Sequence, residues 1–281
     1  MSNGSKAMLR TVTFGQLEAG VWGAVVFTGH DSAVIIAGAA GLTTTGRAAL
    51  HGAATDEDWQ INSDAVELSV SPVGDAVTGA GADPGQEGFD QLCRVTGRIT
   101  VGDAEHEVAS LGVRTARNGE LAPKRFAALR GVAAWFEPVD KLEPADGVRP
   151  ANGVRPADGL TPADGLTVAD GLALTAFRPE GAKGQDADVI SAAVLDPESP
   201  GAVADPRLST TYAADGWAAR AGLELWLGDD EDQPLLRRAA GEAVGARGSA
   251  SDGGLELRAE LFQWHSGGRE GAGVYLVTSR R

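Results

Sequence analysis

In the C-terminal part of the chain, charged side chains share strand faces with tryptophan, and these residues are the first candidates for a functional site. Glu224 stands two residues before Trp226, and Arg258 and Glu260 precede Trp264 at alternate positions. Successive residues of a β-strand point to opposite sides, so each set shares one face. If these faces line a barrel, they form an apolar cavity with a few fixed charges, the usual composition of a small-molecule site.

The ligand-binding residues expected on this basis are Trp22, Glu224, Trp226, Arg258 and Trp264. Glu224 is also the candidate catalytic group, because a carboxyl group kept neutral by burial can protonate a double bond. The alternative is that these faces look outward and the leucine faces form the core. Alternation of Leu with Glu and Arg is also typical of a half-solvated antiparallel sheet.

Other common catalytic signatures are missing from the sequence. It contains no P-loop, dinucleotide fingerprint, GxSxG or HExxH motif. No metal site and no cofactor are expected, because the four histidines are dispersed without ligand spacing: His30, His51, His106 and His265. The single cysteine, Cys93, is interpreted as a small core residue rather than a nucleophile.

The elements that would position these residues are β-strands. The chain from Tyr212 to Thr278 contains three consecutive antiparallel strand candidates, Ala221–Gly228, Gly254–His265 and Gly271–Thr278. Most of the remaining chain resembles them. In the N-terminal half, strands are predicted at Met8–Phe14, Val21–Thr28, Ser32–Ala37 and Ile61–Val70, with Gly41–Asp58 as a loop.

The clearest hairpin of the N-terminal half pairs Gln91–Val101 with Glu105–Arg114 through a Gly102-Asp103 turn. Two segments are ambiguous between helix and strand. Within Lys124–Phe136 a strand from about Gly131 to Glu137 is favoured, and Leu236–Ala246 is left open.

About a dozen strands with few helices predict an all-β protein, and a sheet of that size closes into a barrel or splits into packed sheets. A break near Gly119–Lys124 divides the chain into comparable halves. The expected organisation is a flexible leader (1–7), an N-terminal β half (8–119) and a C-terminal β half (120–281).

An internal repeat with a period of six residues occupies 143–173, from PADGVR through PANGVR to PADGLT and VADGLA. One interpretation is a short solenoid or a calcium loop that uses the repeated Asp and Asn side chains. The other is an Asp-Gly turn copied at the tip of a hairpin between Ala133–Glu137 and Leu172–Arg178. That interpretation is favoured, since lengthening a surface loop costs only about 0.6 kcal/mol per doubling.

The net charge of −15 disfavours nucleic acid and anionic membrane surfaces as partners. No apolar run reaches the length of a transmembrane helix, and the N-terminus lacks a signal-peptide core. A single cysteine is compatible with a reducing cytoplasm, which is the expected location. The oligomeric state is left open.

The order of motifs resembles the two-domain lipocalin-like proteins, a group that includes carotenoid hydratases, AttH-like proteins and, more distantly, tocopherol cyclase. The resemblance rests on Cys93–Thr115, on Gly23 after Trp22 and on Gly268–Val277, and covers most of 8–281 with the repeat as an insertion. It implies two lipocalin-like β-barrel or sandwich halves with a cavity for an apolar ligand. The His-Ser-Trp-Gly-type segment of the group is replaced here by residues 115–118, so no catalytic residue is carried over.

Three functions follow as hypotheses. The first is binding of an apolar small molecule, isoprenoid or lipid-like, in a β-barrel cavity. The second is a hydratase- or cyclase-type enzyme that protonates an isoprenoid with a carboxylic acid. The third is a non-catalytic interaction module in which the repeat loop contacts a protein partner.

Overall fold

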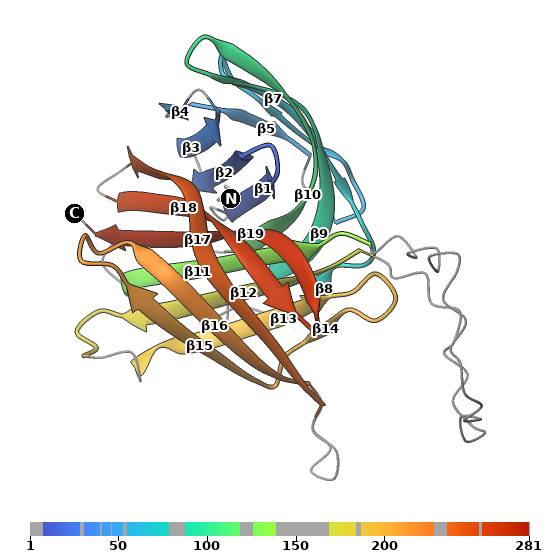
Figure 1. Ribbon diagram of the computed structural model, residues 1–281, viewed down its shortest axis with the longest axis vertical. Helices are drawn as coiled ribbons and strands as arrows, with labels where there is room; N and C mark the ends of the chain where they lie inside the picture. Colours follow the sequence, from blue (N-terminus) through green and yellow to red (C-terminus); the bar gives the residue numbers. More distant parts are fainter. Residues whose placement is uncertain are drawn as a thin grey trace, which may run out of the picture.

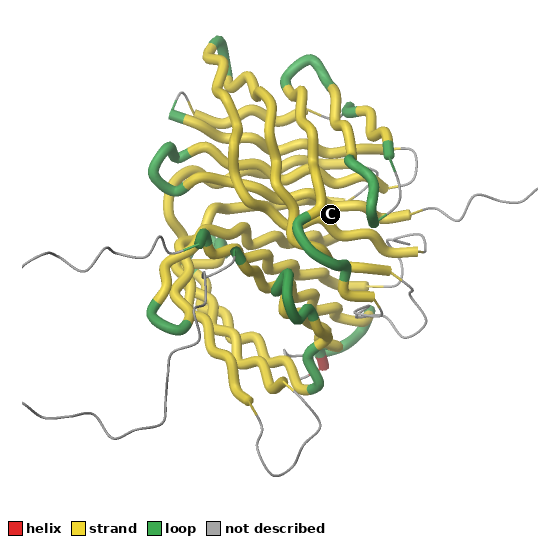
Figure 2. The backbone as a smooth tube through the Cα atoms, turned by 90° about the vertical axis from the view of Figure 1, so that its right-hand side faces the viewer, coloured by secondary structure: helices red, strands yellow, loops and turns green. Residues whose placement is uncertain are grey.

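The computed structural model describes residues 8–28, 31–39, 41–45, 47–52, 55–78, 88–118, 126–138, 169–183, 187–227, 235–252 and 255–280. Strands make up most of this chain, and they form two antiparallel sheets (Figures 1 and 2). The prediction of an all-β protein with two antiparallel halves is confirmed.

The N-terminal sheet has ten strands in the order β4-β3-β2-β1-β10-β9-β7-β6-β5, with β8 paired to β9. Its strands are β1 (Met8–Gln16), β2 (Val21–Thr28), β3 (Asp31–Gly38), β4 (Gly41–Thr45), β5 (Ala49–His51), β6 (Trp59–Asn62), β7 (Val66–Pro72), β8 (Val77–Thr78), β9 (Gly88–Val101) and β10 (Ala104–Asn118).

The C-terminal sheet has nine strands in the order β14-β13-β12-β11-β19-β18-β17-β16-β15. Its strands are β11 (Phe126–Phe136), β12 (Asp170–Pro179), β13 (Val189–Leu195), β14 (Gly201–Ala202), β15 (Asp205–Tyr212), β16 (Ala218–Leu227), β17 (Leu235–Asp252), β18 (Leu255–Ser266) and β19 (Arg269–Arg280).

The two sheets have the same topology. In each, the first strand pairs with the last, β1 with β10 and β11 with β19. The strands at the two ends of each order are consecutive in the chain, β4 with β5 and β14 with β15. Because short connections join these end strands, each sheet must curl until its ends lie close together. Each half therefore forms a strongly curved, nearly closed layer of strands.

The halves pack through the paired first and last strands of each sheet and also through β17. β1 contacts β19, β10 contacts β11, and β17 contacts β3 and β4 (Figure 1). Buried apolar residues from both halves form one continuous cluster here, which includes Trp22, Ile35, Trp135 and Leu261. The Trp135 indole nitrogen donates to the carbonyl of Gly15, 3.3 Å away, and this hydrogen bond crosses between the halves.

Strand β18 is buried on both faces. Leu257, Ala259 and Leu261 belong to the cluster between the halves, whereas Phe262 and Trp264 belong to the core inside the C-terminal half. The predicted alternation of this strand is therefore real, but neither face is solvated along its centre. The leucine face packs against the other half, and the tryptophan face lies inside its own.

Two sequence predictions about the N-terminal half were wrong. Gly41–Asp58 contains the strands β4 and β5, which look like loop in sequence because they are short and largely exposed. Ile61–Val70 is not one strand, because a turn at Ser63–Ala65 separates β6 from β7. The Ser63 amide donates to the carbonyl of Val66 at 2.7 Å, and the Ser63 hydroxyl accepts from the amide of Ala65 at 3.2 Å.

Other predictions about the strands are confirmed. The β9–β10 hairpin turns at Gly102-Asp103, with Gly102 at φ +61° and Val101 opposite Ala104. Leu236–Ala246, which the sequence left open between helix and strand, is strand within β17, and a bulge between Ala243 and Arg247 accommodates Gly245 at φ +93°. Strand β11 includes Gly131–Phe136 and pairs with β12, which is the predicted hairpin. The repeat itself lies outside the described residues, apart from its last copy.

The interior of the N-terminal half contains a buried arginine, Arg114 of β10. Its guanidinium hydrogen-bonds to the side chain of Gln91 at 2.7 and 2.9 Å and to the backbone carbonyls of Thr55, Glu57 and Val70. It also lies 4.9 Å from the centre of the Trp59 ring. One side chain thus ties residues 55–57 and β7 to the closing hairpin.

Replacing Arg114 with methionine should destabilise the fold strongly. The substitution keeps an apolar stem but leaves buried carbonyls unpaired, so we expect the free energy of unfolding to fall by about 2–4 kcal/mol. Arg98→Met is the matched control on β9, because Arg98 is half-exposed and pairs with Glu67 at the surface. That change should cost less than about 1 kcal/mol. Urea unfolding measures both, and equal losses would contradict the role assigned to Arg114.

Candidate functional site

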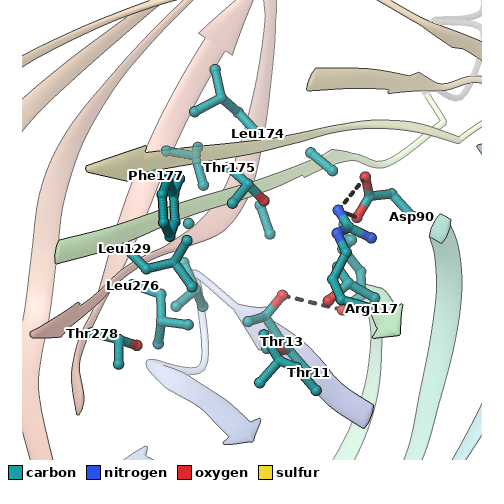
Figure 3. A pocket seen from close by; sticks show the side chains of 18 residues that line it. Thr11, Thr13, Asp90, Arg117, Leu129, Leu174, Thr175, Phe177, Leu276 and Thr278 are labelled. Atoms are coloured by element: carbon teal, nitrogen blue, oxygen red, sulfur yellow. Dashed lines mark hydrogen bonds and ion pairs between the residues drawn. The ribbon is translucent and has the colours of Figure 1, made fainter. Parts of the chain in front are cut away.

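A cavity of about 90 Å³ lies between the two halves, where β1, β9 and β10 face β11, β12 and β19 (Figure 3). Its residues come from both sheets: Leu9, Thr11, Thr13, Asp90, Val113, Thr115, Arg117, Leu129, Gly131, Val132, Ala133, Ala173, Leu174, Thr175, Phe177, Val274, Leu276 and Thr278. The cavity therefore exists only because the halves are packed together.

The N-terminal half supplies the charged groups of this cavity. Asp90 of β9 and Arg117 of β10 are 3% and 5% exposed, and Nη2 of Arg117 lies 2.7 and 2.8 Å from the two carboxylate oxygens. Nη1 of Arg117 donates to the carbonyls of Phe89 and Ala116 at 2.7 and 3.0 Å. Burial raises the pKa of Asp90, although the guanidinium of Arg117 acts in the opposite direction.

The strand register explains how these residues meet. Asp90 lies directly opposite Thr115 across the β9–β10 ladder, and Thr115 lies opposite Thr11 across the β10–β1 ladder. Arg117 follows Thr115 by two positions, so it points to the same face and sits diagonally across from Asp90. One row of the sheet thus presents two threonines and a carboxylate, and the next presents the arginine.

The C-terminal half supplies the apolar side. Leu129, Leu276 and Phe177 lie across the cavity from Asp90 and Arg117 (Figure 3). Gly131 of β11 also faces the cavity, and a Cβ atom there would meet only the side chain of Leu276, at 3.6 Å. The absence of a side chain at Gly131 leaves part of the space open.

The ligand-binding residues predicted from sequence lie in three separate places. Trp22 is fully buried in the cluster between the halves but does not line the cavity. Glu224 and Trp226 of β16 are partly exposed on the outside of the C-terminal half. The Glu224 carboxylate lies 3.3 Å from Nε of Arg238.

Arg258 and Trp264 lie inside the C-terminal half. Trp264 is fully buried and stacks on Phe262 with ring centres 5.8 Å apart. Arg258 is partly exposed, pairs with Glu256 at 2.9 Å and lies 5.4 Å from the centre of the Trp217 ring. None of the five predicted residues lines the cavity between the halves, and their role in binding stays a prediction.

Glu260, next to Arg258 on the same face, is the carboxyl group best suited to hold a proton. It is 3% exposed, and burial raises its pKa to about 7, while Arg247 and the backbone of Ala218 oppose the rise. Nε of Arg247 lies 3.4 Å from it. In β19, paired with β18, Tyr275 opposes Glu260 and lies in the inner core, whereas Val274 and Leu276 face the cavity. The sheet therefore separates Glu260 from the cavity.

Cys93 and Asp170 have structural rather than catalytic roles. Cys93 is buried in the core of the N-terminal half, and burial raises the pKa of its thiol to about 12, which is unsuited to a nucleophile. Asp170, in the last copy of the repeat, pairs with Arg237 at 2.6 Å and with Arg269 at 2.8 Å.

Within the described part of the chain, no group of three or more His, Cys, Asp or Glu residues could hold a metal ion, and no helix is long and apolar enough to cross a membrane.

Sequence reasoning missed Asp90 and Arg117 because it ended the predicted strands too early, at Gln91 and Arg114. In the structure β9 begins at Gly88 and β10 ends at Asn118. Extending the register set by the Gly102-Asp103 turn would have placed an acid and a base diagonally across the ladder, which is a favourable cross-strand pair.

Known proteins resemble this chain in fold but not in sequence. No family model and no curated protein matches the sequence. Similar solved structures include an AttH-like protein from Nitrosomonas europaea (TM-score 0.61, 11% identity, 99% of this chain and 94% of that one). CghA, in a structure with Sch210972, has a TM-score of 0.60 at 10% identity over 98% and 89%. Kievitone hydratase from Nectria haematococca has a TM-score of 0.50 at 8% identity over 100% and 90%.

The chain has the two-domain lipocalin-like fold. The resemblance predicted from the sequence is confirmed at this level. At identities of 8–11% the likeness establishes the arrangement of strands and does not transfer an activity.

Because the pKa of Glu260 is raised, the stability of the fold should depend on pH. Between about pH 4.5 and 7 the folded state holds a proton that the unfolded state has released, so stability falls as the pH rises through this range. Glu260→Gln removes this loss. From pH 5 to pH 8 the wild type should lose roughly 2–3 kcal/mol relative to the variant.

Urea unfolding at both pH values measures the difference. Glu224→Gln is the matched control, since Glu224 lies on the outer face and its side chain is 44% exposed. This variant should keep the loss of stability between pH 5 and pH 8 that the wild type shows through Glu260. A pH profile for Glu260→Gln that runs parallel to that of the wild type would show that the burial of Glu260 does not perturb its ionisation.

Proposed function

We propose that this protein binds an apolar small molecule, isoprenoid or lipid-like, in the cavity between its two halves. The observation that carries the proposal is the make-up of the cavity, in which one buried ion pair and a few threonines face a wall of leucine and phenylalanine. Small-molecule sites are typically apolar spaces in which a few fixed polar groups set the orientation of the ligand.

The size of the cavity limits what it can hold. Its volume is about 90 Å³, whereas sites for whole drug-sized ligands measure roughly 300–1,000 Å³. The space therefore accommodates one end of such a molecule, and the rest would extend beyond it. The end with a polar group belongs beside Asp90 and Arg117.

The second candidate function is a hydratase- or cyclase-type enzyme, and Glu260 is the observation that favours it. A buried carboxyl group with a pKa of about 7 can be a proton donor near neutral pH. The two candidate functions use different places in the fold, because Glu260 and the cavity lie on opposite faces of the same sheet. The carboxyl group in the cavity, Asp90, is held by Arg117 and is not a free acid.

Filling the cavity tests the proposal. Gly131→Leu places an apolar side chain into the space without altering a polar group, so it should abolish binding of farnesol, a representative isoprenoid, as followed by isothermal titration calorimetry. Gly131→Ala is the control, because its Cβ fits against Leu276 at an ordinary distance.

The control should keep binding within about tenfold of the wild type. Unchanged affinity in Gly131→Leu, with an unfolding midpoint equal to that of the wild type, would place the ligand elsewhere. The interior of the C-terminal half would then be the next site to test.

A further inference from the structure

The two charged side chains in the cavity neutralise each other, and the carboxylate of Asp90 keeps unused acceptor positions. Among the described lining residues, Asp90 and Arg117 are the only charged ones. The two terminal nitrogens of Arg117 carry four N–H bonds. Nη1 donates to the carbonyls of Phe89 and Ala116, whereas both oxygens of Asp90 lie on Nη2 and share one of its N–H bonds.

The carboxylate of Asp90 has spare capacity. Two carboxylate oxygens offer about four lone-pair positions, and the contacts with Arg117 use one on each oxygen. A ligand can therefore donate a hydrogen bond to Asp90. Thr11 and Thr115, whose backbones are paired beside Asp90, add hydroxyls that both donate and accept.

An ionised ligand would disturb this balance. A carboxylate would bring a second negative charge next to buried Asp90, and an ammonium would bring a second positive charge next to Arg117. Either charge would have to lose its hydration in a site that is already neutral, which is unfavourable in an apolar interior.

We infer that the ligand is an uncharged apolar alcohol, whose hydroxyl donates to Asp90 while its hydrocarbon faces Leu129, Phe177 and Leu276. This inference rests on the binding function proposed above and names the chemical class for the same site. It excludes fatty acids and other apolar carboxylates as the ligands of this cavity.

A panel of molecules with the same chain tests the inference on the wild-type protein at pH 8. Farnesol should bind. Farnesoic acid, which is ionised at this pH, should bind about a hundredfold more weakly. Farnesyl methyl ether, which lacks the hydroxyl proton, should bind about tenfold more weakly than farnesol. Gly131→Leu should abolish binding of each, which localises the site.

Asp90→Asn extends the test by leaving Arg117 as a net positive charge. In this variant the order should reverse, with farnesoic acid binding more tightly than farnesol. The panel on the wild type needs no variant, so the test survives if Asp90→Asn fails to fold.

The outcomes separate the two proposals. If farnesoic acid binds the wild type as tightly as farnesol and loses binding in Gly131→Leu, the assignment to an alcohol is overturned and the binding site stands. If the wild type binds farnesol more tightly than farnesoic acid and folded Asp90→Asn keeps this order of affinities, the role of Asp90 is overturned. If no member of the panel binds the wild type, the proposed function itself fails.

Discussion

Burial of both faces of the strands at the centre of the molecule is the constraint on which the rest of the structure depends. Each curled sheet has an interior of its own, and the strands that close the sheets also pack against the other half. A face that would meet water in a single lipocalin-like barrel must therefore be apolar here. Leu257 and Leu261 satisfy this requirement in β18, and Trp135 does so in β11.

The same constraint explains where polar side chains could be placed. Inside the halves, Arg114 is satisfied by backbone carbonyls and Gln91, while Glu260 is only partly satisfied and keeps a raised pKa. Between the halves, the charged pair Asp90–Arg117 is the polar part of an otherwise apolar wall. Because burying an unpaired charge is costly, the pair persists as a unit, and its neutrality decides which ligands the cavity can accept.

Period-2 alternation and Gly-Asp turns predicted the all-β fold and the β9–β10 hairpin, but they left Leu236–Ala246 open between helix and strand. They could not predict which face met solvent, because alternation is identical whether the second face meets water or another sheet. That is why Glu224, on the outside, and Glu260, inside, looked equivalent in sequence. Short exposed strands such as β4 lack an apolar face altogether. Asp90 and Arg117 could have been found by extending the hairpin register, but their place in a cavity depends on how the halves pack.

The central claim is that the two halves enclose a site for an uncharged apolar molecule. Native mass spectrometry of the protein purified from its source, followed by solvent extraction of whatever is bound, tests this most directly. The account predicts one equivalent of an apolar alcohol on the wild-type protein and none on Gly131→Leu purified in the same way. An extracted carboxylic acid, or a ligand that remains bound to Gly131→Leu, would contradict it.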